Sequence, residues 1–170
     1  MSVEDVRAYL DEWGRGKDVL EFKVSSATVE LAAIAVGVEG ARIAKTLSFR
    51  GPEDTRGEAV GFPVIMVVCA GDAKVNNSKF KQRFGLKPKM LGQDEVVAGT
   101  GYAIGGVCPF AVSNPRAEIY LDESMKRFST VFPACGSSNS AIEMTCEELF
   151  TCAKAKSWVD VCKLPEAGAA

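Results

Sequence analysis

The most informative feature of the sequence is a residue type that it lacks, because its 170 residues contain no histidine. This excludes Ser–His and Cys–His catalysis and every metal site that depends on imidazole. Any chemistry must come from lysine, carboxylates, tyrosine, cysteine, backbone amides or the substrate itself. Three segments offer such groups: a strand that contains Lys45, a glycine-rich loop over 100–110, and a small polar turn over 135–140.

Lys45 lies in a predicted strand over 42–49. Alternate residues of a strand share a face, which places this lysine on the larger apolar face with Ile43, Leu47 and Phe49, while Ala44, Thr46 and Ser48 face the other way. Burying an ammonium group is costly unless it has a partner. Lys45 therefore either meets an anion in a cleft or covers apolar surface with its stem while its head reaches water. The sequence pattern alone does not decide between these two alternatives.

The loop over 100–110 contains Gly101, Gly105 and Gly106, and Pro109 stiffens its exit. Glycines allow a backbone to approach a ligand closely, so backbone N–H groups here could polarise a carbonyl or a developing oxyanion. The alternative is an ordinary turn. The pattern is not a phosphate-binding P-loop, and no clear helix follows as a dinucleotide-binding motif requires. The polar turn at 135–140 could likewise form a hydrogen-bonding wall or be only a turn.

Six cysteines raise the question of thiol chemistry. No Cys-x-x-Cys pair is present, and a zinc site would need four scattered thiolates. We therefore expect reduced thiols, no metal and no cofactor. Cys108 is the one candidate nucleophile, but no basic residue nearby would lower its pKa. A thiol-based redox protein remains an alternative function.

Charge is unevenly distributed along the chain. The net charge is −2, yet the stretch from Lys74 to Lys89 has six basic residues and no acid. Such a patch can attract a polyanion, or it can be the solvated face of an amphipathic helix. The candidates for nucleic-acid contact are Lys74, Lys79, Lys81 and Arg83.

The elements that must position these groups alternate irregularly between helix and strand. Capping boxes at Ser2 and Thr145 and the stops at Gly37 and Gly85 mark helix ends. We expect helices over 2–13, 28–36, 76–84, 93–98 and 145–155, and strands over 19–24, 42–49, 59–70, 118–121, 130–132 and 141–144. This order predicts a single mixed α/β domain, α+β-like, over 1–160, with a short C-terminal tail over 161–170.

No segment of the sequence suggests a membrane protein. The longest apolar run, 64–70, is too short to cross a bilayer. The first residues are acidic and lack the apolar core of a signal peptide. We therefore expect a cytoplasmic protein that needs no membrane.

Four segments in order make the chain resemble the YbaK/prolyl-tRNA editing family over roughly residues 2 to 155. They are Ala27–Ala33, Ile43–Leu47, the loop Thr100–Phe110, and the Gly136 turn leading into Ile142–Met144. The resemblance implies a domain with a curved, mostly antiparallel central sheet flanked by helices. It also implies hydrolysis of the ester that joins a mispaired amino acid to the terminal adenosine of tRNA.

By position, Lys45 matches the family's essential lysine, and Gly105, Gly106 and Pro109 match the loop that holds the aminoacyl group. We expect Lys45, Gly105 and Gly106 to be catalytic. The residues expected to bind substrate are Thr28, Thr46, Tyr102, Cys108, Pro109, Gly136, Ser138 and Asn139. The sequence departs from the family at Cys108, where a small hydroxyl residue is usual, and at the Gly136 turn, which lacks a histidine.

These residues suggest a hypothesis for the reaction. Lys45 anchors the phosphate of the terminal nucleotide or another anionic group, and amides near Gly105 and Gly106 polarise the ester carbonyl. Water or a substrate group attacks. Cysteine or alanine on proline tRNA are the leading substrates, with serine or threonine as alternatives, and prolyl-tRNA synthetase is the implied partner. The alternatives left open are a binding module of the same fold that does not cleave, and a monomer or a homodimer.

Overall fold

The centre of the protein is a five-stranded sheet with the strand order β6-β2-β3-β5-β8. The computed structural model describes residues 2–52 and 61–166. The strands are β2 (Ile43–Arg50), β3 (Val64–Ala70), β5 (Ala117–Asp122), β6 (Phe132–Pro133) and β8 (Ser157–Val159). All seven residues of β3 are buried, as its unbroken apolar run predicts for a central strand. Residues 59–60 of the predicted strand lie outside the described ranges.

The pairing directions in this sheet are mixed. β2 and β3 form the longest ladder and are antiparallel, with Lys45 opposite Cys69. Two small satellite sheets are also antiparallel: β1 (Leu20–Glu21) with β7 (Ser140–Ala141), and β4 (Lys74–Val75) with β9 (Cys162–Lys163). In contrast, β6, β5 and β8 each join the central sheet in parallel. The mixed α/β class is confirmed, and the antiparallel prediction holds for the long ladder and the satellites but not for these three strands.

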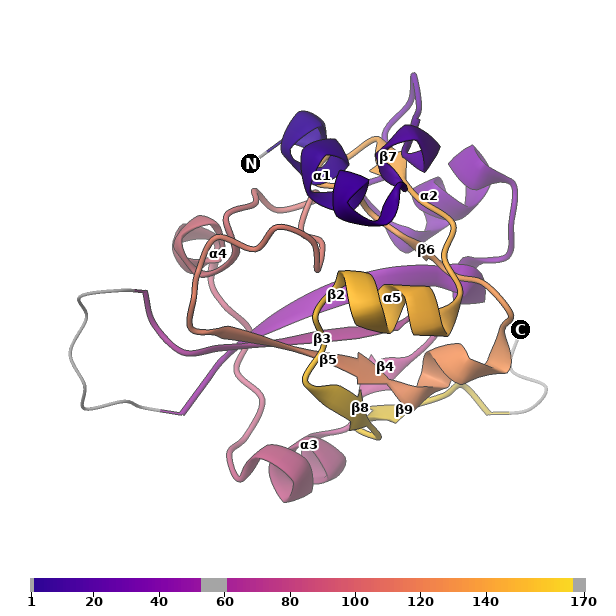
Figure 1. Ribbon diagram of the computed structural model, residues 1–170. Coiled ribbons are helices and arrows are strands. Elements are labelled where there is room, and N and C mark those ends of the chain that lie inside the picture. Colours follow the sequence, from indigo (N-terminus) through magenta and orange to yellow (C-terminus); the bar gives the residue numbers. More distant parts are fainter. Residues whose placement is uncertain (1, 53–60, 167–170) are drawn as a thin grey trace.

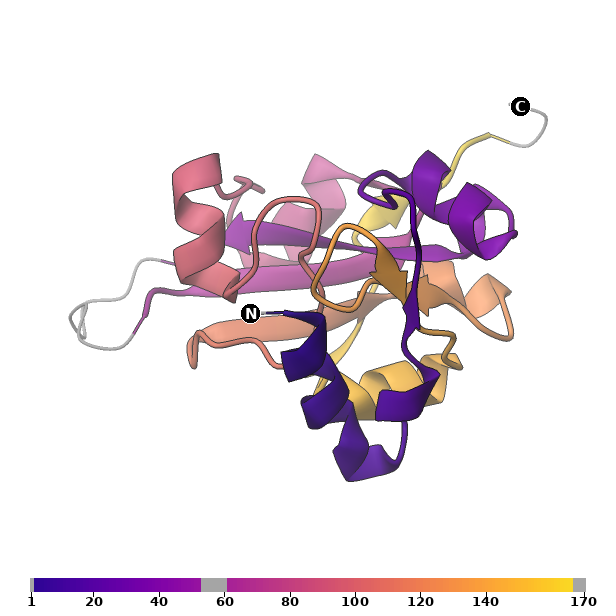
Figure 2. The same cartoon turned by 90° about the horizontal axis from the view of Figure 1, so that it is seen from above.

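The five predicted helices are present. They are α1 (Val3–Leu10), α2 (Val29–Val36), α3 (Asn77–Phe84), α4 (Gln93–Thr100) and α5 (Cys146–Cys152). However, α1 and α5 end at residues 10 and 152 instead of 13 and 155, and α4 ends at residue 100 instead of 98. Ser2 and Thr145 form the predicted capping boxes, and Gly37 and Gly85 end α2 and α3 in the left-handed conformation. In Figure 1, α3 lies below the sheet, whereas α1, α2 and α5 lie above it. Figure 2 shows α4 beside the end of the sheet, away from α5.

The predicted boundary at residue 160 falls inside the fold and is corrected by the structure. Val161 and Cys162 are buried in the main core, and β9 pairs with β4. The sequence does not predict the short strands β4, β8 and β9, because two or three residues are too few to show the alternation of a strand. In the described part of the chain, no helix is long and apolar enough to cross a membrane.

Candidate functional site

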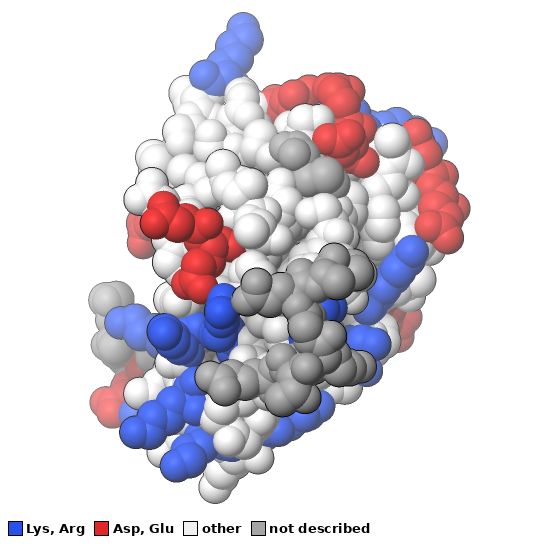
Figure 3. All heavy atoms as spheres, turned by 90° about the vertical axis from the view of Figure 1, so that its left-hand side faces the viewer, with Lys and Arg blue, Asp and Glu red and all other residues white. Residues whose placement is uncertain are grey.

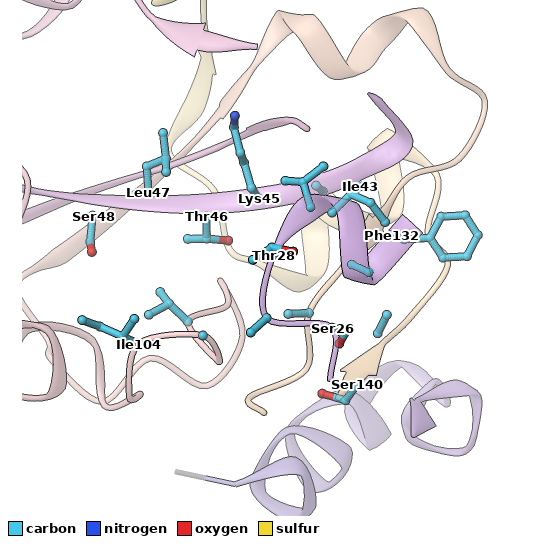
Figure 4. Close-up of a pocket in the computed structure, with 18 of the residues that line it drawn as sticks. Ser26, Thr28, Ile43, Lys45, Thr46, Leu47, Ser48, Ile104, Phe132 and Ser140 are labelled. Carbon is cyan, nitrogen blue, oxygen red and sulfur yellow. The ribbon is translucent and has the colours of Figure 1, made fainter. Parts of the chain in front are cut away.

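A cavity of about 380 Å³ lies against the edge of β2, between the start of α2 and the glycine-rich loop. Its walls come from five segments that are distant in sequence: 26–32, 43–48, 90–96, 104–107 and 132–141. Figure 4 shows these segments converging on one space below β2. The walls are mainly apolar, and they carry the hydroxyl groups of Ser26, Thr28, Thr46, Ser48 and Ser140. We call this space the hydroxyl cavity.

Two of these hydroxyl groups are available to a ligand. Thr46 and Ser48 lie two residues apart on β2, and their side chains point to the same side of the strand, toward the loop that carries Ile104 (Figure 4). Neither hydroxyl has a hydrogen-bond partner among the residues that the structure describes. The Thr28 hydroxyl instead accepts from the Leu31 amide as the cap of α2, and Ser26 donates to the Ser138 carbonyl.

Lys45 lines the same cavity, but its ammonium group is directed to the other face of β2. In Figure 4 its Nζ lies on the side of Leu47, away from Ile104. The Nζ donates to the carbonyl oxygens of Gly71 at 3.2 Å and Ala73 at 2.5 Å. The ammonium group therefore does not share the hydroxyl cavity with the amides near Gly105 and Gly106, as the hypothesis for the reaction requires. Backbone carbonyls thus hold this half-buried side chain, a contact that neither sequence alternative anticipates.

The outer edge of β2 is uncovered beside Thr46. β6 pairs only with Ile43 and Ala44, and the chain returns to the edge where the Leu91 amide donates to the Ser48 carbonyl. No described residue pairs with this edge between these two points. Backbone groups along a strand edge alternate in direction, so Thr46 directs its own N–H and C=O outward at the gap. The cavity therefore also offers a strand edge.

Gly105 and Gly106 of the glycine-rich loop differ in their surroundings. Gly105 lines the hydroxyl cavity and has a φ of +93°, with room for a Cβ at 3.4 Å from that of Ala27. Gly106 is buried, its amide donates to the Ala103 carbonyl at 3.0 Å, and a Cβ there would meet the Gly136 carbonyl oxygen at 3.0 Å. The Gly106 amide is therefore already used, which corrects its expected role as an oxyanion donor.

Other amides of the loop have no acceptor. Those of the cavity residues Ile104, Gly105 and Val107 lack one in the described part of the chain. They are the groups that this loop can offer to a carbonyl oxygen.

Tyr102, Cys108 and Pro109 lie behind the loop rather than in the cavity wall. The Tyr102 hydroxyl donates to the Phe110 carbonyl, and the Cys108 thiol lies 3.7 Å from the same oxygen. Burial raises the pKa of Cys108 to about 11, so this thiol is protonated at neutral pH and is a poor nucleophile. These side chains pack beneath the loop and hold its shape. They do not line the hydroxyl cavity and so would not contact a ligand there.

Apart from Ser140, the polar turn supports the site without lining it. Gly136 has a φ of +91°, and a Cβ there would lie 3.0 Å from the Tyr102 ring. The Asn139 side chain donates to the Phe22 carbonyl at 2.8 Å, and the Ser138 carbonyl accepts from Ser26. This turn therefore fixes segment 22–26, which leads into Thr28.

Sequence reasoning missed several residues of the wall. Ser48 follows from the same alternation that places Thr46, so its signal was present. Met90 and Ile104 come from loops without periodicity, and they expose 58% and 63% of their surface at this site. Large apolar side chains at the rim of a cavity are typical of a ligand-binding surface.

The basic stretch forms a patch in which the lysines are not equivalent. Figure 3 shows Lys and Arg side chains gathered over the lower part of one face. Lys79 binds Asp160 at 3.0 Å and the Cys162 carbonyl, and Arg83 lies over the Phe84 ring and donates to Ser157. Lys74 and Lys81 are exposed and have no partner in the described residues. Of the four residues expected to contact nucleic acid, Lys79 and Arg83 therefore have partners, and Lys74 and Lys81 have none among the described residues.

Comparisons with known proteins agree with this arrangement. The chain is 53% identical over 163 residues to the uncharacterized protein YwhH of Bacillus subtilis, covering 96% of this chain and 98% of that protein. A solved structure described as a candidate trans-editing enzyme for prolyl tRNA synthetase is 29% identical, with a TM-score of 0.78 and 97% of both chains covered. A second, used in epitope backbone grafting by computational design, is 26% identical with a TM-score of 0.80 and the same coverage. The model of the aminoacyl-tRNA editing domain matches residues 24–152. The predicted resemblance is confirmed, and this chain belongs to the aminoacyl-tRNA editing domain family.

Proposed function

We propose that this protein is an aminoacyl-tRNA deacylase that acts in trans and releases cysteine or alanine from tRNA(Pro). Membership of the editing family supports a deacylase role. The observation that carries the proposal is the hydroxyl cavity itself. The hydroxyls of Thr46 and Ser48 share this small space with the amides of Gly105 and Val107, and none of these groups has a partner among the described residues.

The proposed reaction needs no histidine because an aminoacyl ester is already an activated bond. The amides of Gly105 and Val107 polarise the ester carbonyl, and loss of one such donor typically costs on the order of 100-fold in rate. Thr46 and Ser48 hold the polar groups of the amino acid or the ribose by hydrogen bonds. Water or a group of the substrate attacks the carbonyl, and the ribose oxygen leaves with the proton that the nucleophile gives up.

The size of the cavity supports a small amino acid. A volume of about 380 Å³ is near the lower limit of common ligand sites. Part of that space is needed for the terminal ribose and its ester, which leaves room for a side chain such as that of alanine or cysteine. A mainly apolar pocket discriminates only about 100-fold against an isostere that adds a hydroxyl, so we expect serine to compete.

The roles of the remaining expected residues follow from their contacts. Lys45 holds the 71–73 loop and presents its charge on the far face of β2. Gly106, Tyr102, Cys108, Pro109, Gly136, Ser138 and Asn139 position the walls. We propose that the protein works in the cytoplasm on the free acceptor end of tRNA, alongside prolyl-tRNA synthetase.

The test is release of labelled amino acid from Cys-, Ala-, Ser- and Pro-tRNA(Pro). The proposal expects rapid release from the Cys or Ala ester and slow release from the cognate Pro ester. A binding module of the same fold would protect the ester or leave it unchanged, so absence of release from all four substrates contradicts the proposal.

A further inference from the structure

A second cavity, of about 310 Å³, lies on the opposite face of β2 from the hydroxyl cavity. The residues of its wall that matter here are Lys45, Leu47, Lys74, Asn77, Pro88 and Met90. None of the described residues that line it is acidic. We call it the lysine cavity.

The two cavities meet at the uncovered edge of β2. Lys45, Leu47 and Met90 line both of them, whereas Thr46 and Ser48 line only the hydroxyl cavity. This division follows from the alternation of side chains along the strand. The gap that neither β6 nor residues 89–91 cover lies at the same place. An extended chain could therefore pass over the edge of β2 from one cavity to the other.

Most charges around the lysine cavity are positive; the exception is Asp72 of the 71–73 loop, whose carboxylate binds Arg127 and also interacts with Lys45. Lys74 lines it, and Lys87 and Lys89 flank Pro88 in its wall. All three lysines are exposed, and none has a partner in the described ranges. Lys163, the neighbour of Lys74 across the β4–β9 pair, adds a further positive charge. Lys79, by contrast, is paired with Asp160.

On the basis of the proposed function, we infer that the lysine cavity binds the phosphates of the single-stranded nucleotides that precede the terminal adenosine of tRNA. The aminoacyl ester then lies in the hydroxyl cavity, and the sugar–phosphate chain crosses the edge of β2 beside Thr46. Lysines that contact phosphates position a nucleic acid without reading its sequence. The ammonium group of Lys45, on the lysine-cavity face, exchanges a carbonyl acceptor for a phosphate oxygen, which forms a stronger, charge-assisted hydrogen bond.

The experiment measures binding of an uncharged, fluorescein-labelled RNA oligonucleotide that ends in ACCA, by fluorescence anisotropy over a range of salt concentrations. The pocket variant is Lys74→Gln/Lys89→Gln. The matched control, Lys17→Gln/Lys156→Gln, removes the same charge from exposed lysines that also lack partners in the described residues. Lys17 lies next to α1, and Lys156 directly precedes β8, at the opposite edge of the sheet from β2 and β6.

The inference expects the pocket variant to bind on the order of tenfold more weakly than the control at low salt. It also expects the slope of log affinity against log salt to fall by about 1.4, since each phosphate contact to a single strand contributes about 0.7. Equal affinities and slopes in the two variants would overturn it, as would a wild-type protein that does not bind the RNA. The RNA carries no ester, so loss of binding in the pocket variant supports the cavity even if the wild type releases no amino acid, a result that would refute only the deacylase.

Discussion

Lys45 and Thr46 are consecutive residues of β2 whose side chains serve opposite faces of the sheet. The ammonium group of Lys45 donates to carbonyls of the 71–73 loop on the face that α3 covers. The Thr46 side chain points into the hydroxyl cavity on the face that carries α2. A single strand thus separates a cationic surface from a cavity with neutral hydrogen-bonding groups. Because of this separation, we propose that the phosphates bind on the Lys45 face of β2 and that the ester lies on the Thr46 face.

The hydroxyl of Thr46 should matter for activity and not for folding. Because it has no partner in the described part of the chain, Thr46→Val should leave the melting temperature nearly unchanged. Loss of a hydrogen bond to substrate, worth about 0.5–1.5 kcal/mol, should lower kcat/KM by up to about tenfold. Deacylation kinetics and thermal melting check both effects.

Thr100→Val is the matched control for that substitution. The Thr100 hydroxyl is buried and donates to the Val96 carbonyl at 2.7 Å, so its loss should destabilise the protein by about 1 kcal/mol. If Thr46→Val lowered the melting temperature as much as Thr100→Val, the Thr46 hydroxyl would have a partner in the fold and not be free for substrate.

The two loop glycines should respond differently to alanine. Gly106→Ala places a Cβ 3.0 Å from the Gly136 carbonyl oxygen, so the backbone of the 136 turn must move and stability should fall. Gly105→Ala meets only ordinary contacts, but its φ of +93° is unfavourable for alanine, which costs roughly 1–2 kcal/mol. Gly14→Ala, with a φ of +69° and no atom within 4 Å, separates this backbone cost from effects on the cavity. We expect Gly105→Ala, unlike Gly14→Ala, to lower kcat/KM by tenfold or more, and equal activities would contradict the assignment of Gly105 to the site.

Replacement of Lys45 should affect both stability and RNA binding. Lys45→Met keeps the apolar stem but leaves the carbonyls of Gly71 and Ala73 without this donor, at a cost of about 1–3 kcal/mol in the free energy of unfolding. It also removes a charge from the lysine cavity, so the salt dependence of tRNA binding should weaken. Chemical denaturation and binding titrations measure the two effects. A variant that kept wild-type stability would show that the two carbonyl contacts contribute little.

The buried thiol of Cys108 should make stability depend on pH in the alkaline range. Burial raises its pKa from 9.0 to about 11, so the folded state retains a proton that the unfolded state loses above pH 9. The contribution of this thiol to the free energy of unfolding is therefore fully present below pH 9 and is lost as the pH rises toward about 11. Wild type should lose more stability than Cys108→Ala between these pH values in denaturation experiments. Equal slopes for the two proteins would contradict the burial of this thiol.

Local signals in the sequence were sufficient for much of the fold. Capping residues such as Ser2 and Thr145 and the stop at Gly37 give the helix ends, because a cap depends on residues three or four positions away. The division of β2 into two faces follows from strand geometry alone. Strand alternation places Thr46 and Lys45 on opposite faces without reference to any tertiary contact.

The remaining errors concern contacts between segments that are far apart in sequence. The carbonyls that hold Lys45 come from residues 71 and 73, and the carbonyl that crowds Gly106 comes from residue 136. Neither approach leaves a periodic pattern in the sequence. The same holds for Tyr102 and Cys108, whose burial depends on the packing of the loop against the 136 turn, and for Cys162, which is held by its pairing with Val75.

The most direct test of the central claim is single-turnover release of alanine and cysteine from tRNA(Pro) by the wild type and by Thr46→Val/Ser48→Ala. The account predicts release by the wild type and a rate constant at least tenfold lower in the double variant, with both proteins equally folded by circular dichroism. If the double variant released the amino acid as fast as the wild type, the hydroxyl cavity would not be the place where the ester is broken.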